Sequence, residues 1–162
     1  MDSIRSFEDL ECWKTARNLR LFVSREIVAH LPKEERYELA SQLRRASRSI
    51  TANIAEGFVR FHFRDNYKFC SNARGSLFEV LDHLITAHDD RYIDDKMLLE
   101  GRNLFDTAKR LLNGYMNYLT RAANKNRDST VHESSSFYQT GEDHLLSNPV
   151  SDNAPTDNSP NL

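Results

Sequence analysis

The sequence predicts an all-α protein, an antiparallel up-down four-helix bundle followed by a disordered acidic C-terminal tail. Three observations support this fold class. Apolar residues recur at steps of three and four in four separate stretches, no stretch indicates a convincing strand, and the connections between the stretches are short. Helices of about 20 residues joined by short connections must run antiparallel to their neighbours.

The first helix is predicted to begin near Ser6, because Ser6 followed by Asp9 forms a capping-box pattern. Its expected buried stripe consists of Leu10, Trp13, Ala16, Leu19, Val23 and Ile27. Pro32 ends this periodic run, since proline cannot continue a helix.

The second helix is expected to span about Glu35 to Phe58, and it carries both an apolar stripe and many small side chains. The stripe consists of Leu39, Leu43, Ala46, Ile50 and Ile54. The small residues, which lie on more than one side of the helix, are Ala46, Ser47, Ser49, Ala52 and Ala55. They indicate close helix contacts, and two interpretations stay open: all contacts lie inside the bundle, or one crosses a subunit boundary.

The third helix is predicted to begin near Asp65 and to end around His88, and Asp94 or Asp95 can cap the fourth. The third stripe consists of Phe69, Ala73, Leu77, Leu81 and Leu84. The fourth consists of Met97, Gly101, Leu104, Ala108, Leu111, Tyr115 and Tyr118.

Charge divides the chain into two expected parts. Residues 1–127 hold all 22 Lys and Arg against 18 Asp and Glu, a net charge of +4 for the four-helix bundle. Residues 128–162 hold the other six acids and no Lys or Arg, and they are rich in Ser, Asn, Asp and Pro. This composition cannot bury enough apolar surface to fold, so we expect a disordered tail.

The sequence shows no sign of secretion or membrane insertion. Its start is acidic and lacks an apolar run, and no stretch reaches the roughly 18 consecutive apolar residues of a membrane span. Cys12 and Cys70 lie far apart and form no CxxC pair, so no disulfide framework or zinc cluster is indicated. We expect a cytoplasmic protein that has no membrane partner.

Two basic clusters are the candidate binding residues. Arg44, Arg45 and Arg48 crowd the second helix, where they form a solvated face, pair with acids of a neighbouring helix or subunit, or contact phosphates. The segment RFHFR at 60–64 contains Arg60 and Arg64 and is followed by Lys68. Its arginines alternate with aromatics, a pattern that suits a nucleic-acid backbone and its bases. The alternative is a hydrophobic turn whose arginines point to solvent.

Asn53, Glu56 and Gly57 near the end of the second helix are interpreted as structural. A glutamate close to a helix C-terminus opposes the helix dipole by about 0.3–1 kcal/mol, so Glu56 needs a nearby cation. Arg60, Arg64 or Lys68 supplies it, or else an arginine of another subunit does. Gly57 fits a helix terminator.

The residues predict no enzyme, no metal site and no cofactor. Paired Glu-x-x-His motifs of di-iron bundles are absent, as are HExxH, GxxxxGK[ST] and GxGxxG. We interpret Cys70 as a small buried side chain and His83, beside Asp82, as part of a polar surface patch.

Several stretches resemble a known bacterial family. They are SQLRRASRSITANIAEG at 41–57, ARGSL at 73–77, FEDLECWKTA near the start and PKEERYELASQLRRA before the second helix. The chain resembles, over roughly residues 6–120, the four-helix-bundle proteins encoded by intervening sequences in 23S ribosomal RNA genes. It departs from the family pattern at Thr51, Asn66 and Asn72 and in the segment FVRFHFRDN.

The resemblance implies a ring of copies, commonly a pentamer. A related branch serves diversity-generating retroelements as an accessory protein that binds a reverse transcriptase and nucleic acid. Within the matching stretches, the residues expected to serve oligomer or helix packing are Asn53, Glu56, Gly57, Arg74 and Gly75.

Two hypotheses of function follow. The first is a non-enzymatic homo-oligomeric scaffold or adaptor that contacts a protein partner. The second is an accessory protein that binds RNA or DNA, with Arg44, Arg45, Arg48, Arg60, Arg64 and Lys68 as its contacts.

Overall fold

The computed structural model describes the backbone of residues 4–142 and the side chains of residues 4–125. The chain divides into two compact units, Met1–Lys125 and Asn126–Leu162. The α-helices are α1 (Glu11–Phe22), α2 (Val28–His30), α3 (Leu39–Phe58), α4 (Phe63–Asp89) and α5 (Asp95–Glu142). Shorter elements are the 3-10 turns η1 (Phe7–Asp9) and η3 (Lys33–Arg36) and the π-helical turn η2 (Val23–Ile27).

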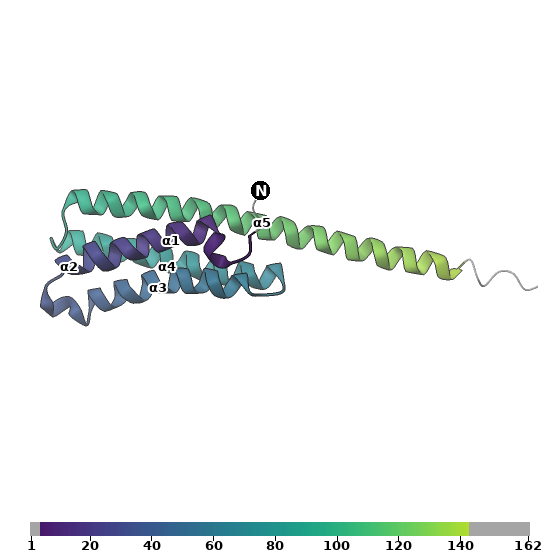
Figure 1. Cartoon of the computed structure of the whole chain (residues 1–162), viewed down its shortest axis with the longest axis horizontal. Coiled ribbons are helices and arrows are strands. Elements are labelled where there is room, and N and C mark those ends of the chain that lie inside the picture. The colour runs from purple at the N-terminus through teal and green to yellow at the C-terminus, as the bar shows by residue number, and fades with distance from the viewer. Residues whose placement is uncertain (1–3, 143–162) are drawn as a thin grey trace, which may run out of the picture. The chain divides into compact units, whose positions relative to one another are not determined.

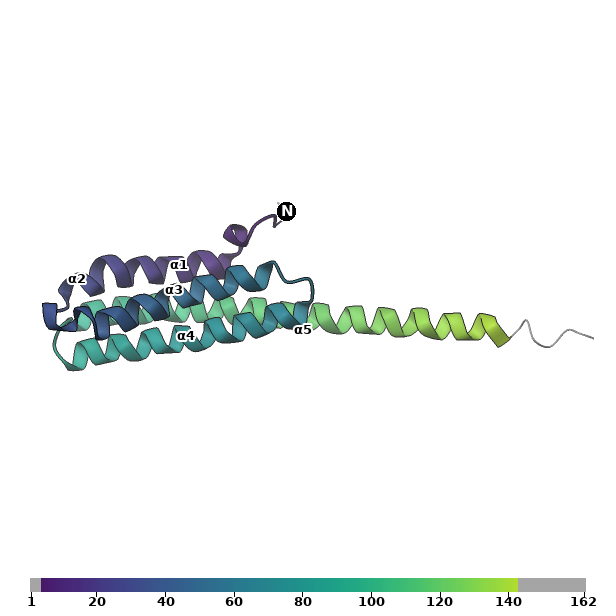
Figure 2. The ribbon, with the colours of Figure 1, turned by 90° about the horizontal axis from the view of Figure 1, so that it is seen from below.

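The first unit is an antiparallel four-helix bundle. The continuous segment α1–η2–α2, then α3, α4 and the part of α5 up to Lys125 run side by side and alternate in direction (Figures 1 and 2). The described residues 4–142 contain no strand. The predicted all-α fold class is therefore confirmed. No helix in this range is long and apolar enough to cross a bilayer.

The capping box at the start of the chain is present, but it caps η1 instead of α1. The Asp9 carboxylate accepts hydrogen bonds from the Ser6 and Arg5 N–H groups, each at 2.9 Å, and the Ser6 hydroxyl accepts from the Glu8 N–H at 3.2 Å. These backbone donors lower the pKa of the Asp9 carboxyl. The predicted start near Ser6 therefore marks a short turn, and α1 begins at Glu11.

The π-helical turn η2 lies inside the first helix, between α1 and α2. A π-turn holds one more residue than an α-turn, so it shifts the apolar stripe around the helix. Phe22, Val23 and Ile27 all remain buried across this turn. The shift explains how a stripe that began at Leu10 stays on the core side for the whole length of the helix.

The second helix begins later than expected. Residues Lys33–Arg36 form η3, and Glu38 leaves helical geometry with φ −101° and ψ −108° before α3 starts at Leu39. The Glu35 carboxylate accepts a hydrogen bond from the Leu39 N–H at 3.0 Å. Glu35 thus stabilises the start of α3 from outside the helix, because it satisfies one of the first free N–H groups.

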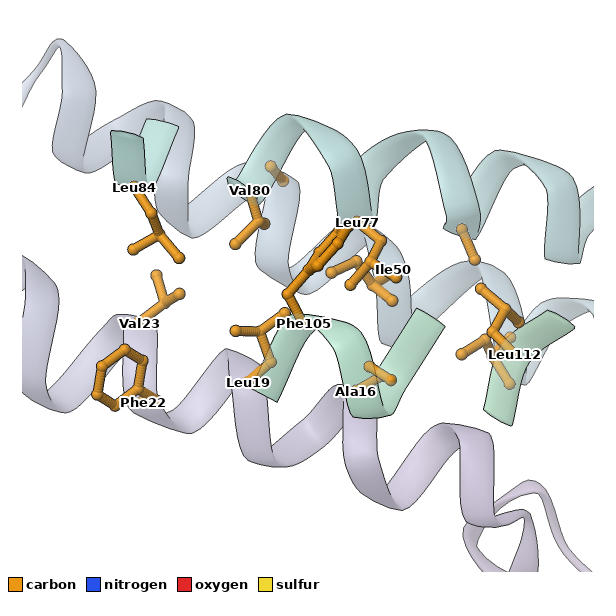
Figure 3. Packing of buried hydrophobic residues seen from close by; sticks show 14 of the residues in the cluster. Ala16, Leu19, Phe22, Val23, Ile50, Leu77, Val80, Leu84, Phe105 and Leu112 are labelled. Carbon is orange, nitrogen blue, oxygen red and sulfur yellow. The ribbon is translucent and has the colours of Figure 1, made fainter. Parts of the chain in front are cut away.

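Apolar side chains from all four helices form the core. Leu19 and Val23 of the first helix, Ile50 of α3, Leu77 of α4 and Leu112 of α5 all belong to this core, and none of them is more than 1% exposed (Figure 3). The whole predicted stripe of α3 is buried, namely Leu39, Leu43, Ala46, Ile50 and Ile54. The helical period found in the sequence therefore places the core face of α3 correctly. The predicted stripe of α5 is displaced by about one residue: Tyr118 is 58% exposed, and the residues that reach the core are Phe105, Ala108, Leu112, Met116 and Leu119.

The connection from α4 to α5 is tight and capped as predicted. Arg91 adopts a positive φ of 62°, and the Asp94 carboxylate accepts a hydrogen bond from the Met97 N–H at 2.8 Å. In the second turn of α5, an added Cβ at Gly101 would lie only 2.8 Å from a Leu84 methyl group. Gly101 therefore lets α5 approach α4 closely.

The predicted boundary after residue 127 falls within α5, which continues to Glu142. The described backbone of residues 128–142 is helical, which differs from the expected irregular tail. Gly141 is the first glycine or proline after residue 114, so no helix breaker interrupts this part of the sequence. Residues 143–162 lie outside the described residues, and disorder there stays a prediction.

Candidate binding surfaces

The first candidate surface is a hollow of about 450 Å³ beside η3 and the first half of α3. We call it the arginine hollow. Its lining residues are Arg36, Tyr37, Ser41, Arg44, Arg45 and Arg48. Arg44 and Arg45 lie three and four residues after Ser41, and Arg48 lies four and three residues after them, so α3 presents all four on one side. Tyr37 extends this face from the turn, with 79% of its surface exposed.

Little negative charge balances the arginine hollow. Arg45 lies 3.9 Å from the Glu79 carboxylate of α4, and both groups are exposed. Within residues 4–125, no carboxylate forms an ion pair with Arg36, Arg44 or Arg48. Arg36 instead lies over the Tyr37 ring, 5.6 Å from its centre.

Like charges four residues apart on a helix repel by a few tenths of a kcal/mol. An anion in the hollow would relieve that repulsion. Phosphate groups suit such a site because the planar guanidinium forks donate paired hydrogen bonds to them.

The second basic cluster, at the turn between α3 and α4, is largely engaged within the bundle. Arg60 forms a salt bridge with Glu56, and its guanidinium lies 4.6 Å from the centre of the Phe69 ring. Lys68 bonds the Asp65 carboxylate at 3.1 Å. The predicted cation beside Glu56 is therefore Arg60, and the six predicted nucleic-acid residues divide into two groups toward opposite ends of α3.

Asn53 lies in a polar contact between α3 and α4. Its amide donates hydrogen bonds to the Ser49 carbonyl at 2.9 Å and to the Ser49 hydroxyl at 3.1 Å. The Ser49 hydroxyl in turn lies 2.8 Å from that of Ser76 in α4. Asn53 therefore helps to orient the serine that joins the two helices.

Gly57 is required by close packing. An added Cβ would lie 2.7 Å from the Asn66 side-chain oxygen and 3.0 Å from the Phe69 Cβ, so a side chain would push α4 away. Its φ is not positive, and α3 continues to Phe58. The expected role of Gly57 as a helix terminator is therefore wrong.

Arg74 and Gly75 face away from α3. The Arg74 guanidinium donates to the Asn113 side-chain oxygen of α5 at 3.4 Å, a long hydrogen bond. Gly75 is exposed, and an added Cβ there would meet no atom within 4 Å among the described residues. Gly75 therefore makes no close helix contact among the described residues, and its expected role in oligomer packing stays a prediction.

Most of the small residues of α3 pack against neighbours inside the bundle, which favours the first of the two interpretations of their pattern. Ala46 and Ser47 are each 1% exposed, and Ser49 bonds Ser76 across the α3–α4 contact. Ala52 is exposed. Packing within the protomer therefore accounts for most of the two-sided pattern on α3.

Two polar contacts were not predicted, although their residues stood out in the sequence as departures from the family pattern. Arg20 of α1 donates to the buried Thr51 hydroxyl of α3 at 2.9 Å. The buried Asn66 amide donates to the Tyr115 hydroxyl of α5 at 2.9 Å. The polar side chains at 51 and 66 thus each join two helices.

Cys12 and Cys70 are the two thiols of the chain. Cys12 and Cys70 are buried free thiols, and burial raises the pKa of each thiol to about 12. Both are therefore protonated at neutral pH, which makes them poor nucleophiles. Among the described residues, no three His, Cys, Asp or Glu side chains lie close enough together to hold a metal ion.

His83 is largely buried, so its interpretation as part of a polar surface patch is wrong. Its side chain is only 13% exposed, and its Nε2 lies 3.7 Å from the Glu79 carboxylate without a hydrogen bond. Glu79 also faces Arg45 of α3, so its carboxylate lies between that arginine and the His83 ring of its own helix.

The fold defines the class of protein: it is an all-α four-helix bundle. Its two basic clusters lie on the surface of α3 and at the turn between α3 and α4. A model of the 23S rRNA-intervening sequence protein family matches residues 8–114, about two thirds of the chain. The chain therefore belongs to this family. Comparison with curated proteins found no match.

Proposed function

We propose that this chain is a non-enzymatic, cytoplasmic scaffold or adaptor that assembles with copies of itself and contacts a protein partner through its surface. The expected number of copies is five, and a reverse transcriptase is one partner that the family resemblance implies. The observation that carries self-assembly is the outer face of α4, where the exposed Gly75 lies close to the half-exposed Phe78.

Packing within one protomer does not explain the glycine at position 75 or the exposure of Phe78 on this face. Glycine inside a helix costs about 1 kcal/mol relative to alanine, and nothing within the bundle packs against Gly75. Phe78 packs edge-to-face on Phe105 with ring centres 5.2 Å apart, yet 52% of its surface remains exposed. A glycine beside an exposed aromatic ring lets the backbone of a second copy approach closely.

The test of assembly is the mass in solution by light scattering. We expect the full chain to show about five times its mass of 18.8 kDa. Gly75→Glu and Phe78→Glu should each shift the protein to smaller species and leave its helical circular dichroism unchanged. Gly114→Glu is the matched control, since Gly114 is also an exposed helical glycine with open space around it. A monomeric full chain would contradict the proposal.

A second candidate function, RNA or DNA binding, is favoured by the arginine hollow. Arg36, Arg44 and Arg48 form no ion pair with a described carboxylate, and the exposed Tyr37 ring beside them offers a stacking surface for a base. The +4 charge of residues 1–127 becomes +20 in five copies, which raises encounter rates with phosphate backbones. Five acidic tails of −6 each would oppose this attraction.

Fluorescence anisotropy with a labelled single-stranded oligonucleotide, titrated against salt, tests this function. Binding should weaken steeply as salt rises. Arg44→Gln combined with Arg48→Gln should lower the salt slope by about 1.4, since each phosphate contact on a single strand contributes about 0.7. Arg60→Gln is the control, because Glu56 and Phe69 already hold Arg60. Equal losses in both variants, or no binding at low salt, would contradict nucleic-acid binding at the hollow.

A further inference from the structure

A second hollow, of about 390 Å³, lies between the first turns of α4 and the α5 residues 119–124. We call it the aromatic hollow. Its lining residues are Phe63, Arg64, Tyr67, Lys68, Leu119, Thr120, Ala123 and Asn124. All of them belong to the bundle unit, and the scaffold and nucleic-acid functions above leave this space unexplained.

The aromatic hollow combines apolar and cationic parts. Leu119 is 1% exposed and belongs to the core, and the partly buried Phe63 packs against that core. Ala123 is a small residue among these larger ones, so space remains above the core. The Tyr67 ring, 37% exposed, adds further apolar surface.

Positive charge borders this apolar space. Lys68 is held by Asp65 at 3.1 Å, whereas Arg64 is exposed and forms no ion pair with a carboxylate in the described part of the chain. Guanidinium donates in a planar fork that matches the two oxygens of a carboxylate. The charge at the mouth and the apolar lining together suit a molecule with one acidic end.

We propose that the aromatic hollow binds a small amphipathic carboxylate, with its alkyl or aryl body over Leu119 and Ala123 and its carboxylate at Arg64. The volume falls at the small end of the range of about 300–1,000 Å³ for small-molecule sites. The mainly apolar lining disfavours a polyanion, which the arginine hollow suits better. This site shares no residue with the arginine hollow or with the Gly75 and Phe78 face, so its test is separate from theirs.

Titration of the full chain with sodium octanoate, followed by amide NMR shifts and by calorimetry, tests the proposal. We expect saturable binding of one octanoate per chain, with shifts centred on Phe63, Tyr67 and Ala123. Octan-1-ol should bind about tenfold more weakly, a difference of about 1.4 kcal/mol, because it cannot form the charge-assisted hydrogen bonds that a carboxylate forms with Arg64. Absent or nonsaturable shifts, or equal affinity for the alcohol, would overturn it.

Two variants locate the site. Arg64→Gln, on α4, should remove the preference for octanoate over octanol and leave octanol binding unchanged. Arg110→Gln, at an exposed arginine of α5, should change neither. Ala123→Phe should fill the space and abolish both. Because Arg64 is exposed, its variant keeps the test valid even where Ala123→Phe fails to fold. Wild-type octanoate affinity in Arg64→Gln would overturn the proposal.

Discussion

Two helical glycines, Gly57 and Gly114, show how differently a missing side chain can act. At Gly57 an added Cβ would lie 2.7 Å from the Asn66 side-chain oxygen and 3.2 Å from the Asn66 carbonyl oxygen, and part of this contact is backbone. At Gly114 it would meet nothing within 4 Å. Gly57 is therefore necessary for the α3–α4 contact, while Gly114 only adds flexibility to the unfolded chain.

We expect Gly57→Ala to destabilise the bundle by about 1–3 kcal/mol, because the forced separation of α3 and α4 strains the core. Gly114→Ala should raise the free energy of unfolding by up to about 1 kcal/mol through helix propensity. Urea denaturation followed by circular dichroism measures both. A stabilised Gly57→Ala protein would show that the close contact is absent.

The thiols offer a second residue-scale prediction. Cys12 is 3% exposed and Cys70 is fully buried, and burial raises the pKa of each to about 12. Reaction with a thiol-specific disulfide reagent at pH 8 should be roughly a hundredfold slower in the folded chain than in urea, because the thiolate is scarce and shielded. Fast stoichiometric labelling of the native protein would contradict their burial.

At the scale of elements, single polar contacts join helices whose packing is otherwise apolar. The Arg20–Thr51 hydrogen bond of 2.9 Å links α1 to α3 across 31 residues of sequence. Thr51 is buried and Arg20 half-buried, so the guanidinium can still reach water when its partner is lost.

The Thr51 hydroxyl also donates to the Arg48 carbonyl of its own helix at 3.1 Å. Thr51→Val removes both hydrogen bonds and should destabilise the protein by about 1–2 kcal/mol, since each contributes about 1 kcal/mol. A double-mutant cycle with Arg20→Met, measured by thermal unfolding, isolates the interaction. Thr86→Val is the control, since the Thr86 hydroxyl bonds only the Asp82 carbonyl of its own helix. Strictly additive effects of Thr51→Val and Arg20→Met would contradict an energetic role for the contact.

For the whole molecule, buried acids of high pKa predict alkaline unfolding. Burial raises the pKa of the Tyr115 hydroxyl to about 12 from its ordinary value of 10, against the lowering effect of the hydrogen bond from Asn66. Cys12 and Cys70 shift in the same direction from 9. In each case the folded state holds the proton more tightly than the unfolded state.

The stability that these groups contribute is fully present below about pH 9, where both states are protonated, and is lost as pH rises toward 12. We expect the urea midpoint to fall progressively from about pH 9 upward. Replacing Cys12 and Cys70 with alanine should make this decline shallower, relative to each protein's own midpoint at pH 7. An unchanged decline would assign it to other groups.

Much of the fold follows from local pattern, and the parts that do not have identifiable reasons. The stripe from Leu39 to Ile54 identified the core face of α3 because helical spacing alone determines which side chains share a face. The start of α1 was misplaced because a capping box can close a 3-10 turn as well as an α-helix. The buried Asn66 could not be assigned a partner because Tyr115 lies 49 residues away.

The sequence by itself determined four amphipathic helices, their antiparallel order and the family to which they belong. It also placed six basic residues on two segments, since helical spacing is a local property. Only the tertiary structure decided which basic side chains have partners. Arg60 contacts Glu56 and Phe69, whereas Arg44 and Arg48 form no ion pair with a carboxylate among residues 4–125. The physical reason is that ion pairing and burial depend on distances between helices, and residue order along one helix does not contain them.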